Sequence, residues 1–153
     1  MPAPVRRATT ADAADVARLL DDFNHEFDDF TPGVPALTKR FEQLLAGDHV
    51  LALLGGGGPE GLAILQLYPS LYYEAPDAYL AELYVAPDRR GEGIGRALLE
   101  AAVDAAREAG AKYIHLGTSE DDVAARGLYE SAGFTNREGR PDGPIMFVYE
   151  RDL

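Results

Sequence analysis

The stretch from residue 78 to residue 110 constrains the fold more than any other part of the chain. An apolar strand pattern ends there before Pro87, because proline cannot donate a hydrogen bond to a continuing ladder. Three alternating glycines follow over residues 91–95, and an alanine-rich helix is predicted from Gly95 to Ala109, with Gly110 as its stop. A strand, a tight turn and a helix in this order predict a fold in which helices pack against a sheet.

Helical and strand patterns alternate through the rest of the chain as well. Further helices are predicted from Thr10 or Asp12 onward and over residues 35–46 and 123–132, where apolar residues recur at helical spacing. Short apolar runs bounded by turn residues predict strands over residues 5–9, 49–54, 61–68, 78–85, 112–116, 134–137 and 145–151. We therefore expect one domain over residues 1–153 with an α/β (α+β) fold. It has about four helices and a central mixed, mostly antiparallel sheet of six to seven strands.

The charge of the chain favours a cationic partner. Its 153 residues include 26 acidic and 14 basic side chains, which gives a formal net charge of −12. Nucleic acids and anionic membranes are held by positive surface, so neither is expected as a partner. A small cationic molecule suits this charge better, although a high acidic content also serves solubility alone.

The content of cysteine and histidine narrows the chemistry. The chain has no cysteine, which excludes disulfides, a thiolate metal site and a cysteine nucleophile. The histidines at positions 25, 49 and 115 are too scattered for a ligand motif, so no metal is expected. The N-terminus shows no apolar leader and no stretch reaches the length of a membrane span, which predicts a cytoplasmic location.

The glycine turn has the character of a phosphate site. Glycines allow unusual backbone dihedrals, and a helix N-terminus points N–H groups and partial positive charge at a ligand. Arg89, Arg90 and Arg96 flank the turn in an otherwise acidic chain. A Walker loop would need Lys and then Ser or Thr where Arg96 and Ala97 stand, and a dinucleotide fingerprint would need a small residue at Arg96. ATP and NAD are therefore disfavoured.

The spacing of Arg90, Gly93 and Gly95 resembles the acyl-CoA signature of the GCN5-related N-acetyltransferase (GNAT) superfamily. That signature has Gln or Arg, two residues, Gly, one residue, and then Gly or Ala. The run from Leu128 to Phe134 is similar to the second signature of the same family. The resemblance implies a GNAT-like fold over most of the chain, acetyl-CoA as cosubstrate, and direct transfer of the acetyl group to an amine.

The resemblance also assigns residues to the cofactor. The backbone of Leu83, Tyr84 and Val85 is implied to pair with the pantetheine arm, where the fourth and fifth strands separate. The pyrophosphate is implied to be enclosed by Arg90, Gly91, Glu92, Gly93, Ile94, Gly95 and Arg96. Asp122 stands where the family often has an asparagine that helps to hold the cofactor, which leaves open whether a carboxylate makes that contact.

Two side chains are candidates for proton transfer. An amine with a pKa near ~10 must lose a proton before it attacks a thioester. By resemblance, Glu82 is the base, acting directly or through water, and Tyr129 is the acid that protonates the departing thiolate. The Val85 N–H is implied as the donor to the oxyanion. The alternatives are that Glu82 is a solvated strand residue and that Tyr129 is core on a short helix.

The acceptor side is less well defined by the sequence. The resemblance places the first helix and the loop after it beside the acceptor, and the acidic residues gathered there are Asp21, Asp22, Glu26, Asp28 and Asp29. They either attract a cation or form a solvated acidic face. Tyr68, Tyr72 and Tyr73 line the same cleft, pack within a hairpin or form a dimer surface. We expect a small cationic amine as acceptor, with a protein amine as the alternative, and pairing into a homodimer is a habit of the family.

Two other functions are consistent with these patterns. A domain that binds acyl-CoA with little catalysis, and serves as a sensor or interaction module, would bind CoA without turnover. A turn that takes a different phosphorylated ligand would bind ATP in competition with CoA. Measuring CoA binding and thiol release together separates both alternatives from acetyl transfer.

Overall fold

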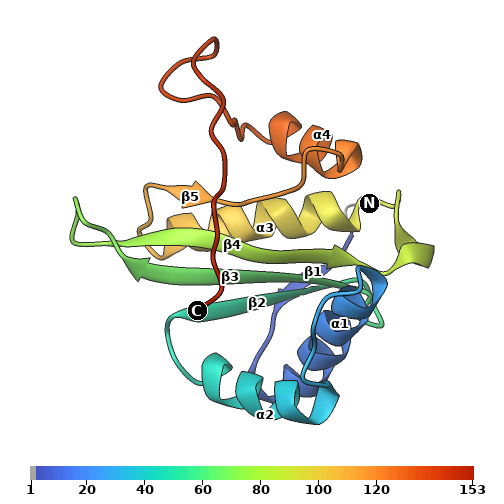
Figure 1. Cartoon of the computed structure of the whole chain (residues 1–153). Helices are drawn as coiled ribbons and strands as arrows, with labels where there is room; N and C mark the ends of the chain where they lie inside the picture. The colour runs from blue at the N-terminus through green and yellow to red at the C-terminus, as the bar shows by residue number, and fades with distance from the viewer. Residues whose placement is uncertain (1–2) are drawn as a thin grey trace. The chain divides into compact units, whose positions relative to one another are not determined.

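The computed structural model describes residues 3–153, which form two compact units that divide after Leu116. The first unit holds a five-stranded sheet of order β1-β2-β3-β4-β5, in which only β4 and β5 run parallel (Figure 1). Its elements are β1 (Val5–Arg7), α1 (Ala13–Glu26), α2 (Val34–Leu45), β2 (Val50–Gly55), β3 (Gly61–Pro69), β4 (Pro76–Val85), α3 (Ile94–Glu108) and β5 (Ile114–His115). The mixed, mostly antiparallel sheet is as predicted.

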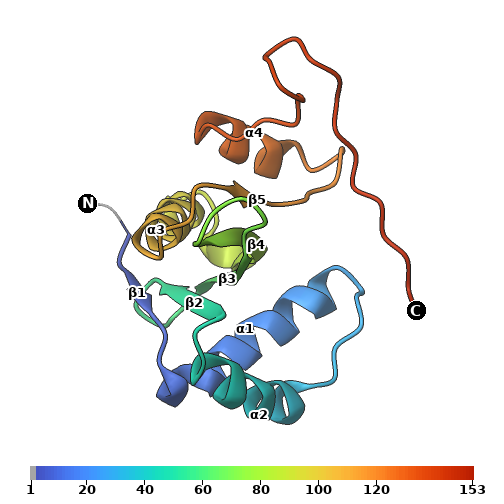
Figure 2. The same ribbon diagram turned by 90° about the vertical axis from the view of Figure 1, so that its left-hand side faces the viewer.

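Helices cover both faces of this sheet (Figure 2). On one face, Leu62 and Ile64 of β3 share a buried cluster with residues of α1 and α2. On the other face, Leu65 of β3 is buried together with Ala106 of α3. Neighbouring residues of β3 therefore point to opposite helical layers, as the two-residue period of a strand requires.

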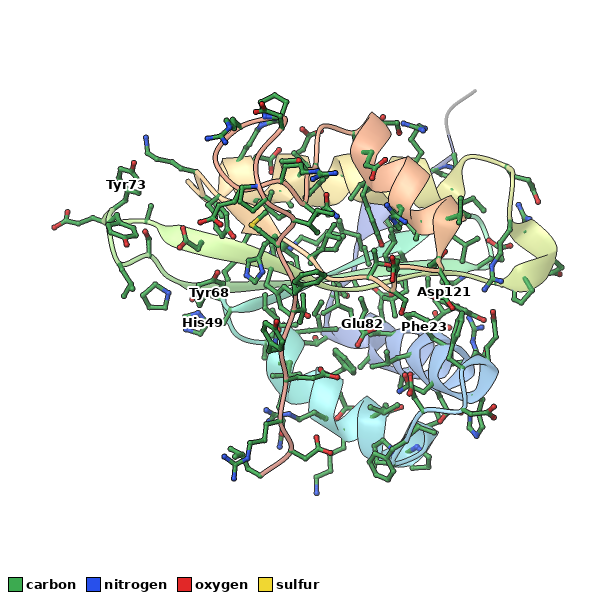
Figure 3. The ribbon with its side chains drawn as sticks, turned by 45° about the horizontal axis from the view of Figure 1, so that its top comes forward. Phe23, His49, Tyr68, Tyr73, Glu82 and Asp121 are labelled. Carbon is green, nitrogen blue, oxygen red and sulfur yellow. The ribbon has the colours of Figure 1, made fainter. Side chains whose placement is uncertain are left out.

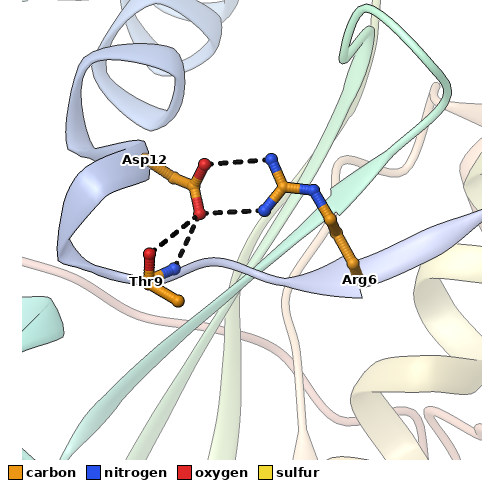
Figure 4. A network of polar contacts seen from close by, with 3 residues as sticks. All are labelled: Arg6, Thr9 and Asp12. Atoms are coloured by element: carbon orange, nitrogen blue, oxygen red, sulfur yellow. Dashed lines mark hydrogen bonds and ion pairs between the residues drawn. The ribbon is translucent and has the colours of Figure 1, made fainter.

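Three residues join β1 to the first helix (Figure 4). The Asp12 carboxylate accepts hydrogen bonds from the two terminal guanidinium nitrogens of Arg6, at 2.8 and 2.9 Å, and from the Thr9 N–H at 2.8 Å. These bonds, that of Arg6 above all, hold the pKa of Asp12 well below its usual range. A 3-10 turn over Thr10–Asp12 precedes α1, so the α-helix itself begins at Ala13, just after the predicted start.

The hairpin of β2 and β3 lies directly against the start of α3. Gly55 and Gly61 face each other in register at its base. A β-carbon at Gly55 would lie 2.9 Å from Cγ2 of Ile94, and one at Gly61 would lie 2.7 Å from the same atom. Because side chains at these two positions would collide with Ile94, the first residue of α3 packs on the bare backbone of the hairpin.

The second unit contains α4 (Val123–Ser131), close to the helix predicted over residues 123–132. Asp122 caps this helix, since its carboxylate accepts a hydrogen bond from the Ala125 N–H at 3.1 Å. The chain leaves the helix through Gly133, whose φ of 93° lies in the left-handed region. The helix therefore has sequence signals at both ends.

The strands predicted at the C-terminal end are wrong. Residues 134–137 and 145–151 contain only an isolated antiparallel bridge between Arg137 and Ile145. The apolar residues after Ile145 are largely exposed. An apolar run forms a strand only where the edge of another strand is available for pairing, and the apolar pattern alone does not reveal such an edge. The strand predicted over residues 112–116 shortens to β5, so the described residues form five strands and not six to seven.

Candidate active site

β4 contains a β-bulge at Ala81. Ile64 of β3 pairs with Glu82 and Leu65 pairs with Leu80, so Ala81 has no partner of its own in the ladder. Because successive side chains of a strand alternate between faces, one extra residue moves every later side chain to the other face. Side chains at even-numbered positions of β4 therefore face the layer of α3 before Ala81 and the layer of α1 and α2 after it.

The bulge directs Glu82 to the face that α1 and α2 cover. Ala78, before the bulge, belongs to the cluster beneath α3, whereas Tyr84, after it, belongs to the cluster beneath α1 and α2. A regular strand would place these two residues on the same face, since an even number of positions separates them. Glu82 lies two residues before Tyr84, and its ladder partner Ile64 belongs to the same cluster as Tyr84, so Glu82 shares that face. In a regular strand that kept every residue of β4, this carboxylate would point into the apolar layer beneath α3.

Glu82 lines a pocket of about 320 Å³, together with Leu20, Phe41, Leu44, Val50, Ile64, Gln66, Tyr79 and Ala81. Its side chain is partly buried, and within residues 3–153 the structure records no hydrogen bond or ion pair to its carboxylate. Burial raises the pKa of Glu82, and the Asp29 carboxylate raises it further. A carboxylate with a raised pKa is a better proton acceptor near neutral pH than an ordinary surface glutamate.

β4 has an open edge beyond its short contact with β5. The two strands pair only through Ala78 with Ile114 and through Tyr79 with His115. In the part of the chain that the structure describes, no strand pairs with this edge of β4 after Tyr79. The strands thus separate before Glu82, as the resemblance implied.

The backbone of Leu83 and Val85 points to this open edge. On the side of β3, the Ala86 N–H donates to the Glu60 carbonyl at 2.8 Å. Backbone groups of an antiparallel strand alternate between its two edges, so those of Val85 and Leu83 turn away from β3. Arg90 reaches one of them, because its Nε donates to the Val85 carbonyl at 2.9 Å. An extended ligand with amide groups could pair with such an edge as an added strand does.

The turn after β4 supplies backbone donors for an anion. Gly91 and Gly93 have φ angles of 83° and 87°, in the left-handed region that favours glycine. A β-carbon at either position would meet nothing within 4 Å, so the turn needs these glycines for its backbone path and not for space. The path leads to the N-terminus of α3, where the first-turn N–H groups lack partners within the helix and attract anions.

Arg89 and Arg90, which the sequence placed beside a phosphate, are held by carboxylates. Arg89 donates to Glu60 at 2.6 Å and to Glu92 at 3.0 Å. Arg90 donates to Glu26 at 2.8 Å. The contacts of Glu60 and Glu26 with the turn were not predicted, because these residues lie 29 and 64 positions from their partners and belong to no motif.

An aromatic stack connects the end of α1 to β4. Phe23 lies parallel to Tyr84, with ring centroids 5.0 Å apart, and Phe27 meets Phe23 edge-on at 5.4 Å. The guanidinium of Arg90 lies 5.8 Å from the centroid of the Tyr84 ring. Burial raises the pKa of Tyr84, and the Glu26 carboxylate adds to this effect. The predicted acidic segment thus lies beside the strand that carries Glu82.

Tyr129 belongs to the second unit. Burial raises the pKa of its hydroxyl, and the Asp122 carboxylate raises it further. Its ring meets Phe134 at a centroid distance of 6.2 Å. The hydroxyl is therefore protonated at neutral pH, which is the state that an acid requires. The packing of Tyr129 and the protonated state of its hydroxyl fit both alternatives from the sequence, an acid and a core residue of a short helix.

Two of the tyrosines predicted near the acceptor lie elsewhere. Tyr68 and Tyr73 line a separate pocket of about 330 Å³ at the far ends of β3 and β4, together with His49 (Figure 3). The tyrosine that lines the Glu82 pocket is Tyr79, which was not predicted. Among residues 3–153, no group of His, Asp or Glu side chains could hold a metal ion. No helix in that range has the length and apolar character needed to cross a bilayer.

Comparison with known proteins gives the family. A sequence model of the Acetyltransferase (GNAT) family matches residues 16–134. The uncharacterized N-acetyltransferase YhfO of Bacillus subtilis is 31% identical over 140 residues, which cover 88% of this chain and 91% of that protein. The chain belongs to the GNAT family of N-acetyltransferases, as the spacing of Arg90, Gly93 and Gly95 indicated.

Two further proteins are similar to this chain in sequence or in fold. An aminoglycoside N(6')-acetyltransferase type 1 of Stenotrophomonas maltophilia is 31% identical over 137 residues, 88% of this chain and 87% of that protein. A crystal structure of a protein assigned as an acetyltransferase from Arthrobacter sp. FB24 superposes with a TM-score of 0.90. It is 46% identical and the match covers 98% of this chain and 96% of that one. The GNAT fold is therefore shared over nearly the full length.

Proposed function

We propose that this protein transfers the acetyl group of acetyl-CoA to a primary amine of a small cationic acceptor, with Glu82 as the base. The observation that carries the proposal is the position of Glu82. Its carboxylate has a raised pKa, lines a pocket and lies on β4 just after the strand separates from β5. A base at this point can take the proton of an amine that enters the pocket.

Acetyl-CoA suits the open edge and the turn. The backbone groups of Leu83 and Val85 face outward and can pair with the amides of the pantetheine arm. The turn from Arg90 through Gly91, Glu92, Gly93, Ile94 and Gly95 to Arg96 brings backbone N–H groups to the N-terminus of α3, where they can bind the pyrophosphate. When bound, acetyl-CoA supplies the thioester carbonyl that the amine attacks.

Groups of this chain then carry out the two proton transfers and stabilise the negative charge that develops on the substrate. Glu82 accepts a proton from the amine, directly or through water, and the Val85 N–H donates a hydrogen bond to the oxygen that becomes negative. Tyr129 gives its proton to the departing thiolate, and Asp122 borders the cofactor as well as capping α4. Transfer is direct, without a covalent intermediate on the enzyme.

The acceptor is proposed from charge. The net charge is −12, and Asp29 and Glu26 act on Glu82 and Tyr84, so a cation is attracted to this side of the sheet. The Stenotrophomonas relative is named for aminoglycosides, which are small polycations. A protein amine is the second candidate. We further propose that residues 1–153 act as one cytoplasmic catalytic domain that pairs as a homodimer and needs no metal, nucleic acid or membrane.

The test is thiol release from acetyl-CoA across amine classes, with CoA binding measured by calorimetry in parallel. Glu82→Gln should lower kcat by about 10²–10³-fold, the usual contribution of a general base, while CoA binding stays unchanged. The acid limb of the wild-type rate profile should lie above the range of an ordinary glutamate, because the pKa of Glu82 is raised. Glu82→Gln should lack this limb.

A matched control is Glu100→Gln, which removes the same charge from an exposed position of α3. Full activity of Glu82→Gln at every pH would show that Glu82 is not the base. CoA binding without release on any amine would favour the sensor or interaction module. Absence of CoA binding, with ATP bound in its place, would contradict acetyl transfer altogether.

A further inference from the structure

Glu60, in the loop between β2 and β3, gives a carboxylate to the turn that follows β4. Oε1 of Glu60 accepts a hydrogen bond from Nη1 of Arg89 at 2.6 Å. Only 23% of the Glu60 side chain is exposed, and its second oxygen is buried without a hydrogen-bond partner among the described residues. Such a carboxylate depends on its one cationic partner, because a buried charge without a partner is strongly unfavourable.

The backbone around Glu60 is fixed from several sides. The Glu60 N–H donates to the Gly55 carbonyl at 2.9 Å, and the Glu60 carbonyl accepts from the Ala86 N–H at 2.8 Å. Arg18 of α1 donates to the carbonyl of the preceding residue, Pro59, at 3.1 Å. Hydrogen bonds from the sheet and from α1 therefore fix the backbone that carries the Glu60 carboxylate.

Arg89 links the fixed residue Glu60 to the turn. Its Nη1 binds Glu60, while its Nε binds Oε2 of Glu92 at 3.0 Å. Arg89 comes before Gly91 and Glu92 comes after it, so one guanidinium connects the hairpin to both sides of the glycine. At the other end of the turn, Ile94 packs against the base of the same hairpin. The hairpin thus contacts the turn at its beginning and at its end.

We propose that Glu60 is a positioning residue for acyl-CoA, which acts through Arg89 to hold the turn in its anion-binding shape. The inference rests on the proposed function, since the turn is a cofactor site only in that case. Glu60 and Arg89 need not touch the cofactor in this role. A turn held in shape before binding loses less freedom when the ligand arrives, so its affinity is higher.

A competing view makes the opposite prediction. If Glu60 only neutralises Arg89, its removal would free a guanidinium for the phosphates and CoA would bind more tightly. If Glu60 positions the turn, its removal weakens CoA binding although the local charge becomes more positive. The sign of the change therefore decides between the two views.

The experiment measures CoA affinity by calorimetry and steady-state kinetics for Glu60→Gln, Arg89→Gln and the double variant. We expect each single variant to raise the Kd of CoA and the KM of acetyl-CoA roughly tenfold, the size of one charge-assisted hydrogen bond. kcat at saturating acetyl-CoA should stay within about twofold, because Glu82 is untouched. The double variant should be no weaker than the single ones, since both remove the same contact.

Glu100→Gln is again the control, and it should leave Kd and KM unchanged. CoA binding by Glu60→Gln that is tighter than, or equal to, that of Glu100→Gln would overturn the inference. If Glu60→Gln does not fold, Arg89→Lys replaces it, because lysine keeps the charge but cannot bind Glu60 and Glu92 as a fork, and the same weakening is expected. A wild type that fails to bind CoA would overturn the proposed function, and this inference with it. A wild type that binds CoA as tightly as its Glu60→Gln variant would overturn the inference alone.

Discussion

The junction of β1 with α1 and the middle of β4 each carry a carboxyl group, and their pKa values are shifted in opposite directions. At the junction, Asp12 accepts hydrogen bonds from Arg6 and Thr9, and these lower its pKa (Figure 4). In β4, burial and the Asp29 carboxylate both raise the pKa of Glu82. One carboxylate strengthens the fold and binds protons poorly, whereas the other weakens the fold and binds protons well. The difference shows that a carboxylate becomes a better proton acceptor where it lacks the hydrogen-bond and ion-pair partners that would stabilise its charge.

The two groups also respond to pH in opposite directions. Asp12 binds fewer protons in the folded state than in the unfolded state, so its contribution is present above its unfolded pKa and is lost as the pH falls. Glu82 binds more protons in the folded state, so its contribution is present below its unfolded pKa and is lost as the pH rises through the folded pKa. One deletion and two substitutions test this contrast.

Deletion of Ala81 should have the largest effect, because it removes the bulge next to Glu82. The pairs Leu80–Leu65 and Glu82–Ile64 would become consecutive in a regular ladder, so Glu82 would keep its face but lose the local bend and twist that the bulge gives to β4. We expect acetyl transfer to fall by about 10²-fold, the effect of moving a reacting group by ~1 Å. Thiol release measures the change, and Ala81→Ser, which keeps the strand length, is the control. Near-normal turnover in the deletion variant would show that the bulge does not position Glu82 for proton transfer.

Replacement of Asp12 by asparagine should have an intermediate effect on stability. It removes the ion pair with Arg6 and weakens the acceptor for the Thr9 N–H, so we expect a loss of about 1 kcal/mol at pH 7. The difference from wild type should shrink below about pH 4, as protonation destabilises the wild type itself. Urea unfolding at several pH values measures it, with the exposed Asp48→Asn as the charge-matched control. A loss that stays constant down to pH 2 would mean that the carboxylate charge is not what stabilises the junction.

Replacement of Glu82 by glutamine should have the smallest effect on stability, and of the opposite sign. At pH 7 the wild type must keep a partly buried charge that glutamine does not carry, so Tm should rise by no more than roughly 2–4 °C. At pH 4 Glu82 is protonated in the folded wild type, and the gain should disappear. Calorimetric scans at both pH values measure it, with Glu100→Gln for comparison. A lower Tm of Glu82→Gln at pH 7 would mean that the Glu82 charge has a favourable partner.

Local patterns predicted much of this fold. The strand before Pro87, the glycine turn and the helix that ends just before Gly110 follow from residue types whose backbone preferences are strong. The spacing of Arg90 and the glycines also identified the family. Neighbouring residues carry these signals, so no knowledge of distant parts of the chain is needed.

Features that depend on distant residues could not be predicted in the same way. Ala81 has no property of a bulge residue, and its role appears only in the register with β3. The contacts of Glu60 and Glu26 with the two arginines depend on how the hairpin and α1 meet the turn. The apolar run after Ile145 suggested a strand, but pairing requires an edge that the sequence does not reveal.

The open edge of β4 has a consequence for the handling of the protein. Among residues 3–153, no strand pairs with the edge of β4 that carries the backbone of Leu83 and Val85, and an open strand edge can pair with another chain. A ligand that pairs with this edge takes away the template for aggregation. Protein stored without CoA should therefore associate more readily at high concentration than protein stored with it, and the cosubstrate would serve as a solubilising additive during crystallisation.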